Sequence, residues 1–205
     1  MKRSPGTQLV ELVVLGLLSE QAQHGYELHR RIVASFGTIF QPSWGSLYPA
    51  LARLERDRAV ESSSESATNF IPTTGSLSGE LALFRSARSA LTPRRQRKVY
   101  VISEIGLRLF EKHLTSIEID DERSFWIGLS FADHLPPDQR LSLINRRRYL
   151  LDDQLRAMKD SPKFDESGWR SIALRGMSDR VSAELEWLTT LATSLLHNDD
   201  KVAGE

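Results

Sequence analysis

The chain contains no cysteine, and this absence excludes disulfides, thiolate zinc sites and cysteine nucleophiles. It also lacks a long hydrophobic run, because the longest, over residues 9–18, is interrupted by Glu11. Such a run is too short to cross a bilayer, and it lacks the flanks of a signal peptide. We therefore expect a cytoplasmic protein that does not enter a membrane.

Motifs for catalysis and metal binding are missing as well. The sequence has no nucleophile elbow, no phosphate-binding loop, no dinucleotide fingerprint and no zinc-binding histidine pair. His24 and His29 are five residues apart, whereas two zinc ligands on one helix face are four apart. We therefore expect no enzyme, no metal and no cofactor.

The net charge of zero conceals a difference between the two halves of the chain. Residues 1–103 carry 13 Lys and Arg against 8 Asp and Glu, whereas residues 104–205 carry 14 against 19. This imbalance indicates that only the first half faces a polyanion. An apolar content of 40% over 205 residues suffices for one large or two small cores.

Pro49 fixes the start of a helix in the first half. A proline ring clashes with the carbonyl four residues earlier, so Gly45 is predicted to lie outside the helix and Ser46 to be its N-cap. The buried stripe of this helix is predicted by leucines at i, i+4 and i+7: Leu47, Leu51 and Leu54. A helix with an exposed positive end and Arg53 on its flank suits insertion into a DNA groove.

The surrounding pattern is that of a helix-turn-helix followed by a two-stranded β-wing. The expected elements are helices over 7–19 (capped by Thr7), 23–35 (ended by Gly37) and 80–91, and strands over 59–62 and 99–103. Between the strands lies a long wing insertion, about 63–96, whose first part is rich in Ser and Thr.

The second half is predicted to be entirely helical. Its expected helices cover 104–116 (capped by Ser103), 121–134, 137–158 and 169–197. The last helix carries a seam typical of packing against partner helices, and we expect dimerisation through Leu174, Met177, Val181, Leu185, Leu188 and Leu195. The predicted fold is mainly α, with a winged helix-turn-helix DNA-binding domain over 1–116 and a helical dimerisation and effector domain over 117–205.

Four motifs, in this order, resemble the PadR-type winged-helix transcriptional regulators. They are Leu15-Gly16-Leu17-Leu18, Gly25-Tyr26-Glu27-Leu28, Ser46-Leu47-Tyr48-Pro49-Ala50-Leu51 with Leu54-Glu55, and Arg97-Lys98-Val99-Tyr100 with Ile102-Ser103 and Gly106. Phe131, Leu135-Pro136 and the long last helix resemble the larger C-terminal domain of one subgroup.

The resemblance implies a homodimeric repressor whose C-terminal helices are exchanged between subunits and which often responds to a small molecule. Two features depart from the family. Asp57-Arg58-Ala59 stands where the family usually has a glycine, and the wing insertion is unusually long.

For DNA contacts we expect residues from the recognition helix, the wing and the N-terminus. Hydroxyls reach phosphates or base edges, and arginine bonds guanine bidentately or a phosphate. The candidates are Trp44, Ser46, Tyr48 and Arg53, the wing cations Arg94, Arg95, Arg97 and Lys98, and a basic arm of Lys2 and Arg3. The structural alternative is that Tyr48 and Trp44 pack on the domain and Arg53 only solvates a helix.

Aromatic residues of the second half are candidates for an effector pocket at the dimer interface. They are Phe125, Trp126, Phe131 and Tyr149, and the ligand class they suit is a small apolar or aromatic molecule. Ordinary core packing is the alternative for these residues, and packing at the dimer interface is a further alternative for Trp126.

The function expected from these features is a homodimeric repressor that binds a pseudo-palindromic operator in double-stranded DNA and is released by a small effector. The alternative is an adaptor that uses a winged-helix scaffold for protein contacts, without sequence-specific DNA binding.

Overall fold

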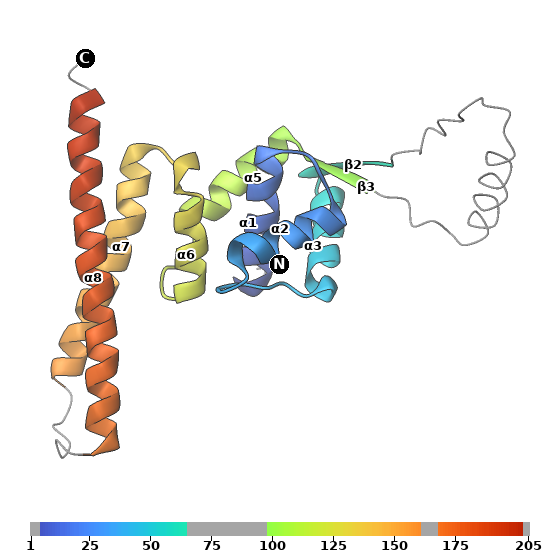
Figure 1. The fold of residues 1–205 in the computed structure, drawn as a ribbon. Coiled ribbons are helices and arrows are strands. Elements are labelled where there is room, and N and C mark those ends of the chain that lie inside the picture. Colours follow the sequence, from blue (N-terminus) through green and yellow to red (C-terminus); the bar gives the residue numbers. More distant parts are fainter. Residues whose placement is uncertain (1–4, 65–97, 161–167, 203–205) are drawn as a thin grey trace, which may run out of the picture. The chain divides into compact units, whose positions relative to one another are not determined.

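The computed structural model describes residues 5–64, 98–160 and 168–202. Its elements, in chain order, are α1 (Pro5–Glu20), β1 (Gln23–His24), α2 (Gly25–Phe36), α3 (Trp44–Arg56), β2 (Val60–Ser64), β3 (Lys98–Ile102), α5 (Glu104–Thr115), α6 (Glu122–Ser130), the 3-10 turn η1 (Ala132–His134), α7 (Pro137–Lys159) and α8 (Trp169–Val202) (Figure 1). The predicted mainly helical fold with a winged helix is confirmed. The predicted helix over 80–91 lies outside the described residues.

The chain forms two compact units. The winged unit is Val13–Leu109, and the helical unit combines Met1–Leu12 with Phe110–Glu205. The boundaries therefore fall within α1 and α5, whereas the sequence placed a single boundary between residues 116 and 117. The first turns of a helix cannot be assigned to a separate core from their local pattern alone.

The two predicted wing strands are present as β2 and β3, and the short strand β1 adds a third strand to the sheet of the winged unit. β3 lies in the middle and pairs antiparallel with β1 and with β2. Tyr100 pairs with Gln23 on one side and with Ser62 on the other. β1 was not predicted because two residues are too few to show an alternating pattern.

The core of the winged unit forms around α1 and one face of α3. The predicted stripe on α3 is confirmed, since Leu47, Leu51 and Leu54 are at most 1% exposed. The remaining large apolar members include Leu15, Leu18, Leu28, Ile32, Phe36 and Val60. Burying this stripe fixes which face of α3 remains for solvent.

The predicted start of α3 is wrong. The helix begins at Trp44, so Gly45 lies inside it and Ser43, not Ser46, is the N-cap residue. The Ser46 and Leu47 backbone N–H groups both donate to the Ser43 carbonyl at 3.0 Å, which makes a tight first turn. The helix tolerates Pro49 one turn further in because the Gly45 carbonyl that loses its N–H donor lies on an exposed residue.

Two other predicted helix ends also differ. α1 begins at Pro5 rather than at a Thr7 cap, in line with the preference of proline for the first helical turn. The helix expected over 121–134 is divided, because α6 ends at Ser130 and Phe131 and Leu135 turn inward to become buried. The ends at Gly37 and Ser103 were predicted correctly: Gly37 caps α2, and the Gly106 N–H donates to Ser103 Oγ at 3.1 Å.

The turn that departs from the family pattern has a left-handed residue at Arg58, with φ 59°. The Ala59 N–H donates to the Leu54 carbonyl at 2.8 Å and the Arg58 N–H to the Glu55 carbonyl at 3.0 Å. These two bonds form a Schellman motif, which normally has glycine at the left-handed position. The motif therefore forms here at the cost of a strained arginine backbone.

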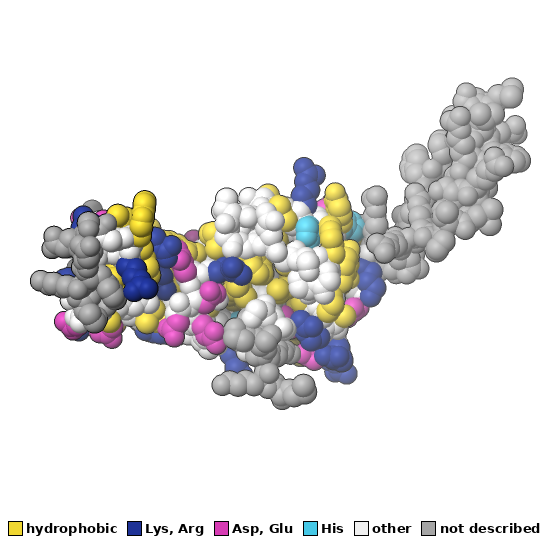
Figure 2. All heavy atoms as spheres, turned by 90° about the horizontal axis from the view of Figure 1, so that it is seen from below, with side chains coloured by type: hydrophobic (Ala, Val, Ile, Leu, Met, Phe, Trp, Pro, Cys, Tyr) yellow, Lys and Arg dark blue, Asp and Glu magenta, His cyan; other side chains and the backbone are white. Residues whose placement is uncertain are grey.

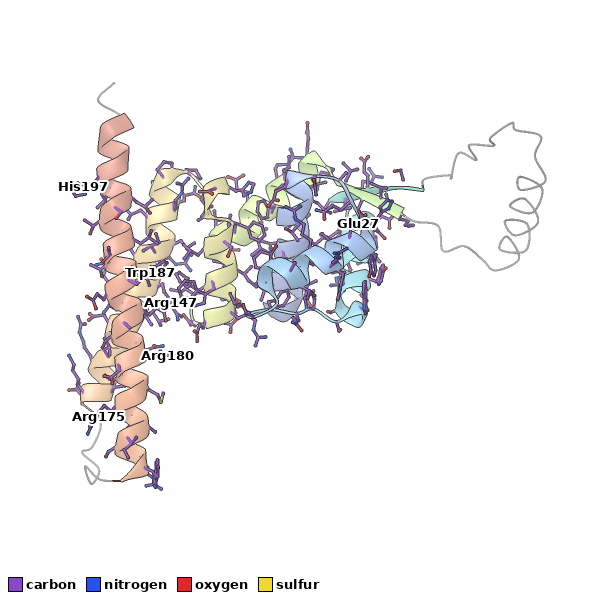
Figure 3. All side chains as sticks on the ribbon, in the orientation of Figure 1. Glu27, Arg147, Arg175, Arg180, Trp187 and His197 are labelled. Carbon is purple, nitrogen blue, oxygen red and sulfur yellow. The ribbon has the colours of Figure 1, made fainter. Side chains whose placement is uncertain are left out.

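In the helical unit, α7 and α8 pack along one another, and a buried arginine joins them to α6. Arg147 on α7 is 4% exposed and pairs with Glu184 on α8 at 2.8 Å. It also donates to the Ile119 carbonyl at 2.6 Å and lies 5.1 Å from the centre of the Phe125 ring on α6. Arg147 and Trp187 lie at similar heights along this helical pair (Figure 3).

Candidate nucleic-acid interface

A cluster of aromatic rings covers the first turns of α3. Trp44 is its centre, with ring centroids 3.7 Å from His29, 5.7 Å from Tyr48 and 6.0 Å from Tyr26, all in stacked orientation. Trp44 and Tyr48 remain 42% and 43% exposed, and Tyr26 is 65% exposed. Figure 2 shows hydrophobic side chains beside histidine side chains at the surface of the molecule. We name Tyr26, His29, Trp44 and Tyr48 the aromatic cluster.

Residues of α2 and of the sheet pack against the aromatic cluster and hold it in place. His29 Nε2 lies 3.1 Å from the Pro42 carbonyl oxygen, which holds the imidazole against Trp44. Gly25 has no side chain, and a Cβ there would lie 3.3 Å from both the Tyr48 and the Tyr100 rings. The two tyrosines therefore approach the start of α2 closely, which accounts for glycine in the Gly25-Tyr26 motif.

The other predicted residues of α3 lie along the same helix. Ser46 is half-buried; its hydroxyl donates to the Ser43 carbonyl at 2.9 Å and accepts a long hydrogen bond from the Ser43 hydroxyl at 3.4 Å. Arg53 is half-buried near the last turn. Trp44, Ser46 and Tyr48 thus lie in the first turns of α3, and Arg53 lies near its last turn.

Lys98 is held by the end of α3. Its ammonium lies 3.1 and 3.3 Å from the two carboxylate oxygens of Glu55, and the Ser62 hydroxyl also donates to this carboxylate. The Ser62 hydrogen bond, followed by Lys98, holds the pKa of Glu55 below its usual value despite partial burial. Burial raises the pKa of the neighbouring Tyr100, so its phenol stays neutral.

Five predicted DNA contacts lie outside the described residues: Lys2, Arg3, Arg94, Arg95 and Arg97. Two members of the aromatic cluster, Tyr26 and His29, were missed. Their signal in the sequence was weak, because two polar aromatics three residues apart on an amphipathic helix are typical of an ordinary solvent-facing side.

The four predicted effector residues do not line a common cavity in the described part of the chain. Phe125 and Phe131 are buried, whereas Tyr149 is 73% exposed. Trp126 packs against Trp187, with ring centroids 5.4 Å apart. The structure thus brings Trp126 to a partner that the sequence did not suggest.

The predicted dimerisation residues fall into two groups. Val181 and Leu188 are 7% and 0% exposed within the single chain, so they belong to its own core. Met177 is 55% exposed, and Leu174 and Leu185 are half-exposed. An open groove of about 780 Å³ between α7 and α8 includes Met158, Leu174 and Met177 in its lining.

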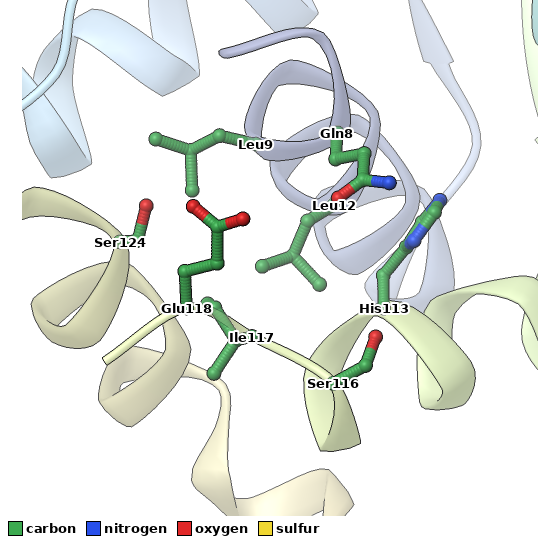
Figure 4. Close-up of a pocket in the computed structure, with 8 residues that line it drawn as sticks. All are labelled: Gln8, Leu9, Leu12, His113, Ser116, Ile117, Glu118 and Ser124. Atoms are coloured by element: carbon green, nitrogen blue, oxygen red, sulfur yellow. The ribbon is translucent and has the colours of Figure 1, made fainter. Parts of the chain in front are cut away.

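A small cavity lies within the helical unit, between α1, α5 and the start of α6 (Figure 4). Its polar lining comprises Gln8, His113, Ser116, Glu118 and Ser124. With a volume of about 20 Å³ it has room for one water molecule and not for an aromatic effector, which needs a few hundred Å³.

The described residues contain no group of three or more His, Asp or Glu side chains placed to hold a metal ion. Among the described helices, none combines the length and the apolar character that a bilayer crossing requires.

Several solved structures resemble the chain at low identity. Bacillus subtilis PadR in complex with p-coumaric acid is 13% identical, with a TM-score of 0.38 over 95% of this chain and 98% of that one. The same protein in complex with operator DNA is 15% identical, with a TM-score of 0.37 over 90% and 98%. A PadR-like transcriptional regulator from Bacillus cereus is 17% identical, with a TM-score of 0.34 over 92% and 99%.

No curated protein sequence matches the chain. The family model described as "Transcriptional regulator PadR-like family" matches residues 14–73, the segment that contains α2, α3 and β2. Because the TM-scores all lie below 0.5, the assignment rests on this matched segment. Residues 14–73 therefore match the PadR-like family, as the sequence motifs predicted.

Proposed function

We propose that this protein binds double-stranded DNA through α3 and the wing and acts as a homodimeric repressor at an inverted-repeat operator. The observation that carries the proposal is the aromatic cluster at the N-terminal end of α3, exposed on a helix whose opposite face is buried. Helix N-termini favour phosphate anions, and the second helix of a helix-turn-helix enters the major groove.

In this proposal the residues of α3 have different roles. Trp44, Ser46 and Tyr48 contact the backbone or base edges at the start of the helix, and Arg53 reaches a guanine or a phosphate further along. Lys98 and the predicted cations Lys2, Arg3, Arg94, Arg95 and Arg97 add phosphate contacts, which are independent of sequence.

Dimerisation is proposed to use the exposed face of α8 and the groove beside it. Trp169, Ile172 and Met177 are 85%, 47% and 55% exposed, an unusual density of large apolar side chains for a surface. A second copy of the chain would bury these residues together with Leu174, Leu185 and Leu195, whereas Val181 and Leu188 support the helix from inside. Such a dimer presents two α3 helices to successive half-sites.

The small effector is proposed to be apolar or aromatic; Bacillus subtilis PadR has been solved in complex with p-coumaric acid, which is an aromatic molecule. The contact between Trp126 and Trp187 supports a site near α6 and α8, since Trp187 is 46% exposed. Quenching or a shift of tryptophan fluorescence on titration with hydroxycinnamic acids would report binding there, and Trp187→Phe should remove most of that signal.

The test of DNA binding is a fluorescence anisotropy titration with duplexes taken from upstream of the protein's own gene. We expect saturable binding that weakens steeply as salt rises, with competition by the same duplex far stronger than by a random one. Absence of any binding at low salt would overturn the proposal and favour the adaptor, which uses the same scaffold for protein contacts.

A further inference from the structure

Glu55 connects the end of α3 to both long strands of the wing. Its carboxylate accepts a hydrogen bond from Ser62 on β2, and both of its oxygens lie within 3.3 Å of the Lys98 ammonium on β3. The Lys98 and Glu55 side chains are 45% and 36% exposed, so solvent and a DNA backbone can reach the pair.

A carboxylate at this position affects how strongly Lys98 attracts a phosphate. The pKa of Glu55 is lowered by the Ser62 hydrogen bond and by Lys98, so the carboxylate is charged at neutral pH. A phosphate that approaches the Lys98 ammonium therefore also meets the negative charge of Glu55, whose oxygens lie 3.1 and 3.3 Å from the ammonium nitrogen. The Coulomb attraction of Lys98 is partly cancelled by the repulsion from Glu55.

We propose that Glu55 weakens the contact between the wing and the DNA backbone by keeping Lys98 paired. Glu55 is thus a positioning residue that acts through Lys98 and contacts no DNA itself. The effect is on affinity for any duplex, because phosphate contacts do not depend on sequence. This inference rests on the proposed DNA-binding function.

The experiment measures the binding of a random-sequence duplex, at several salt concentrations, by wild type, Glu55→Gln, Lys98→Gln and the double variant. A glutamine oxygen at the position of Oε1 still accepts from Ser62 and Lys98, so E55Q removes the charge and loses only the second contact of Lys98, at 3.3 Å. We expect E55Q to bind roughly 3- to 10-fold more tightly at low salt, with a salt slope steeper by up to about 0.9.

Two controls separate this effect from a general change in charge. Glu61→Gln removes the same charge from an exposed position on β2 and should change affinity less than 2-fold, roughly the effect of one distant charge. In the Lys98→Gln background, E55Q should bring no gain. Melting curves of every variant check that the fold is kept.

Equal effects of E55Q and E61Q, or a gain from E55Q that persists without Lys98, would overturn the inference. If E55Q did not fold, Lys98→Gln alone would decide: a loss below about 2-fold supports a restrained lysine, whereas a loss of 3- to 10-fold overturns it. Wild type that binds no duplex at all would instead contradict the proposed function.

Discussion

The winged unit has an ion pair at its surface, whereas the helical unit has an arginine paired in its interior. In the winged unit, the Glu55–Lys98 ion pair lies at the surface beside the proposed DNA-binding face. In the helical unit, Arg147 is 4% exposed and satisfied by Glu184, the Ile119 carbonyl and the Phe125 ring. The same residue types therefore indicate a binding surface in one unit and a structural connection in the other, and only burial distinguishes them.

The largest expected effect removes the buried arginine. Arg147→Ala leaves Glu184 charged and nearly buried, and we expect it to lower the free energy of unfolding by about 3–5 kcal/mol. Urea denaturation measures this change. Arg148→Ala is the matched control, because the neighbouring guanidinium is half-exposed and donates to Thr189 at 3.2 Å, and it should cost less than about 1 kcal/mol. If the two substitutions lowered the free energy of unfolding equally, burial of Arg147 would not be what makes this arginine important for stability.

A second prediction concerns close packing in the winged unit. At Gly106 a Cβ would lie 2.1 Å from the Ala59 carbonyl oxygen, so Gly106→Ala should destabilise the protein by about 1–3 kcal/mol or more. In the helical unit, a Cβ at Gly176 would meet nothing within 4 Å. Gly176→Ala should therefore stabilise α8, by about 0.5–1 kcal/mol in thermal denaturation. A Gly106→Ala variant as stable as wild type, or more stable, would refute the close approach of α5 to the Ala59 carbonyl.

The surface role of Arg53 is tested by DNA binding and not by stability. Arg53→Ala should weaken operator binding by about 1–3 kcal/mol and reduce the preference over a random duplex if the side chain bonds guanine. Anisotropy titrations at fixed salt measure both quantities. Arg108 is an exposed residue of α5, and Arg108→Ala is the control that should change neither the affinity nor the preference for the operator. If Arg53→Ala changed neither the affinity nor the preference, Arg53 would have no role in recognising the operator sequence.

The strained turn after α3 predicts a gain in stability. Arg58→Gly places glycine at the left-handed position, and we expect about 1 kcal/mol of stabilisation. Arg56→Gly, two residues earlier and still helical, should instead cost about 0.5–1 kcal/mol. A loss at Arg58→Gly in chemical denaturation would mean that the arginine side chain contributes more than its backbone strain costs.

A last prediction concerns the cap of α6 in the helical unit. Asp121 accepts hydrogen bonds from the Ser124 backbone N–H at 3.0 Å and from the Ser124 hydroxyl at 2.7 Å. Burial raises the pKa of Asp121, but these hydrogen bonds and Arg123 together lower it by more, so the net shift is downward. Asp121→Ala should cost about 1 kcal/mol at neutral pH. A lowered pKa means that the carboxylate stabilises the fold above about pH 4, and the difference from wild type should shrink as the pH falls through the folded-state pKa.

Asp120 directly precedes Asp121 and is exposed, so it provides the control for that cap: Asp120→Ala should leave stability nearly unchanged. A difference between wild type and Asp121→Ala that stays constant from pH 7 to pH 3 would show that the carboxylate charge is not involved.

Periodicity predicted most of the elements because each buried stripe is a local pattern. The stripe of Leu47, Leu51 and Leu54 and the helix over Pro137–Lys159 were both predicted from spacing. Helix starts were less predictable: the rule that places proline in the first turn gave Ser46 as the N-cap, whereas Trp44, Gly45 and Ser46 are all helical. The aromatic cluster was half predicted, because Trp44 and Tyr48 share a helix while Tyr26 and His29 come from another.

The sequence by itself determined the helical class of this protein, its winged-helix motif and the match of residues 14–73 to the PadR-like family, because these depend on residue order and spacing within short segments. Only the tertiary structure decided which charges are buried, that Lys98 is paired with Glu55 across 43 residues of chain, and that Trp187 rather than Tyr149 meets Trp126. Such contacts join distant segments, and their energies depend on burial and distance, which no local pattern contains.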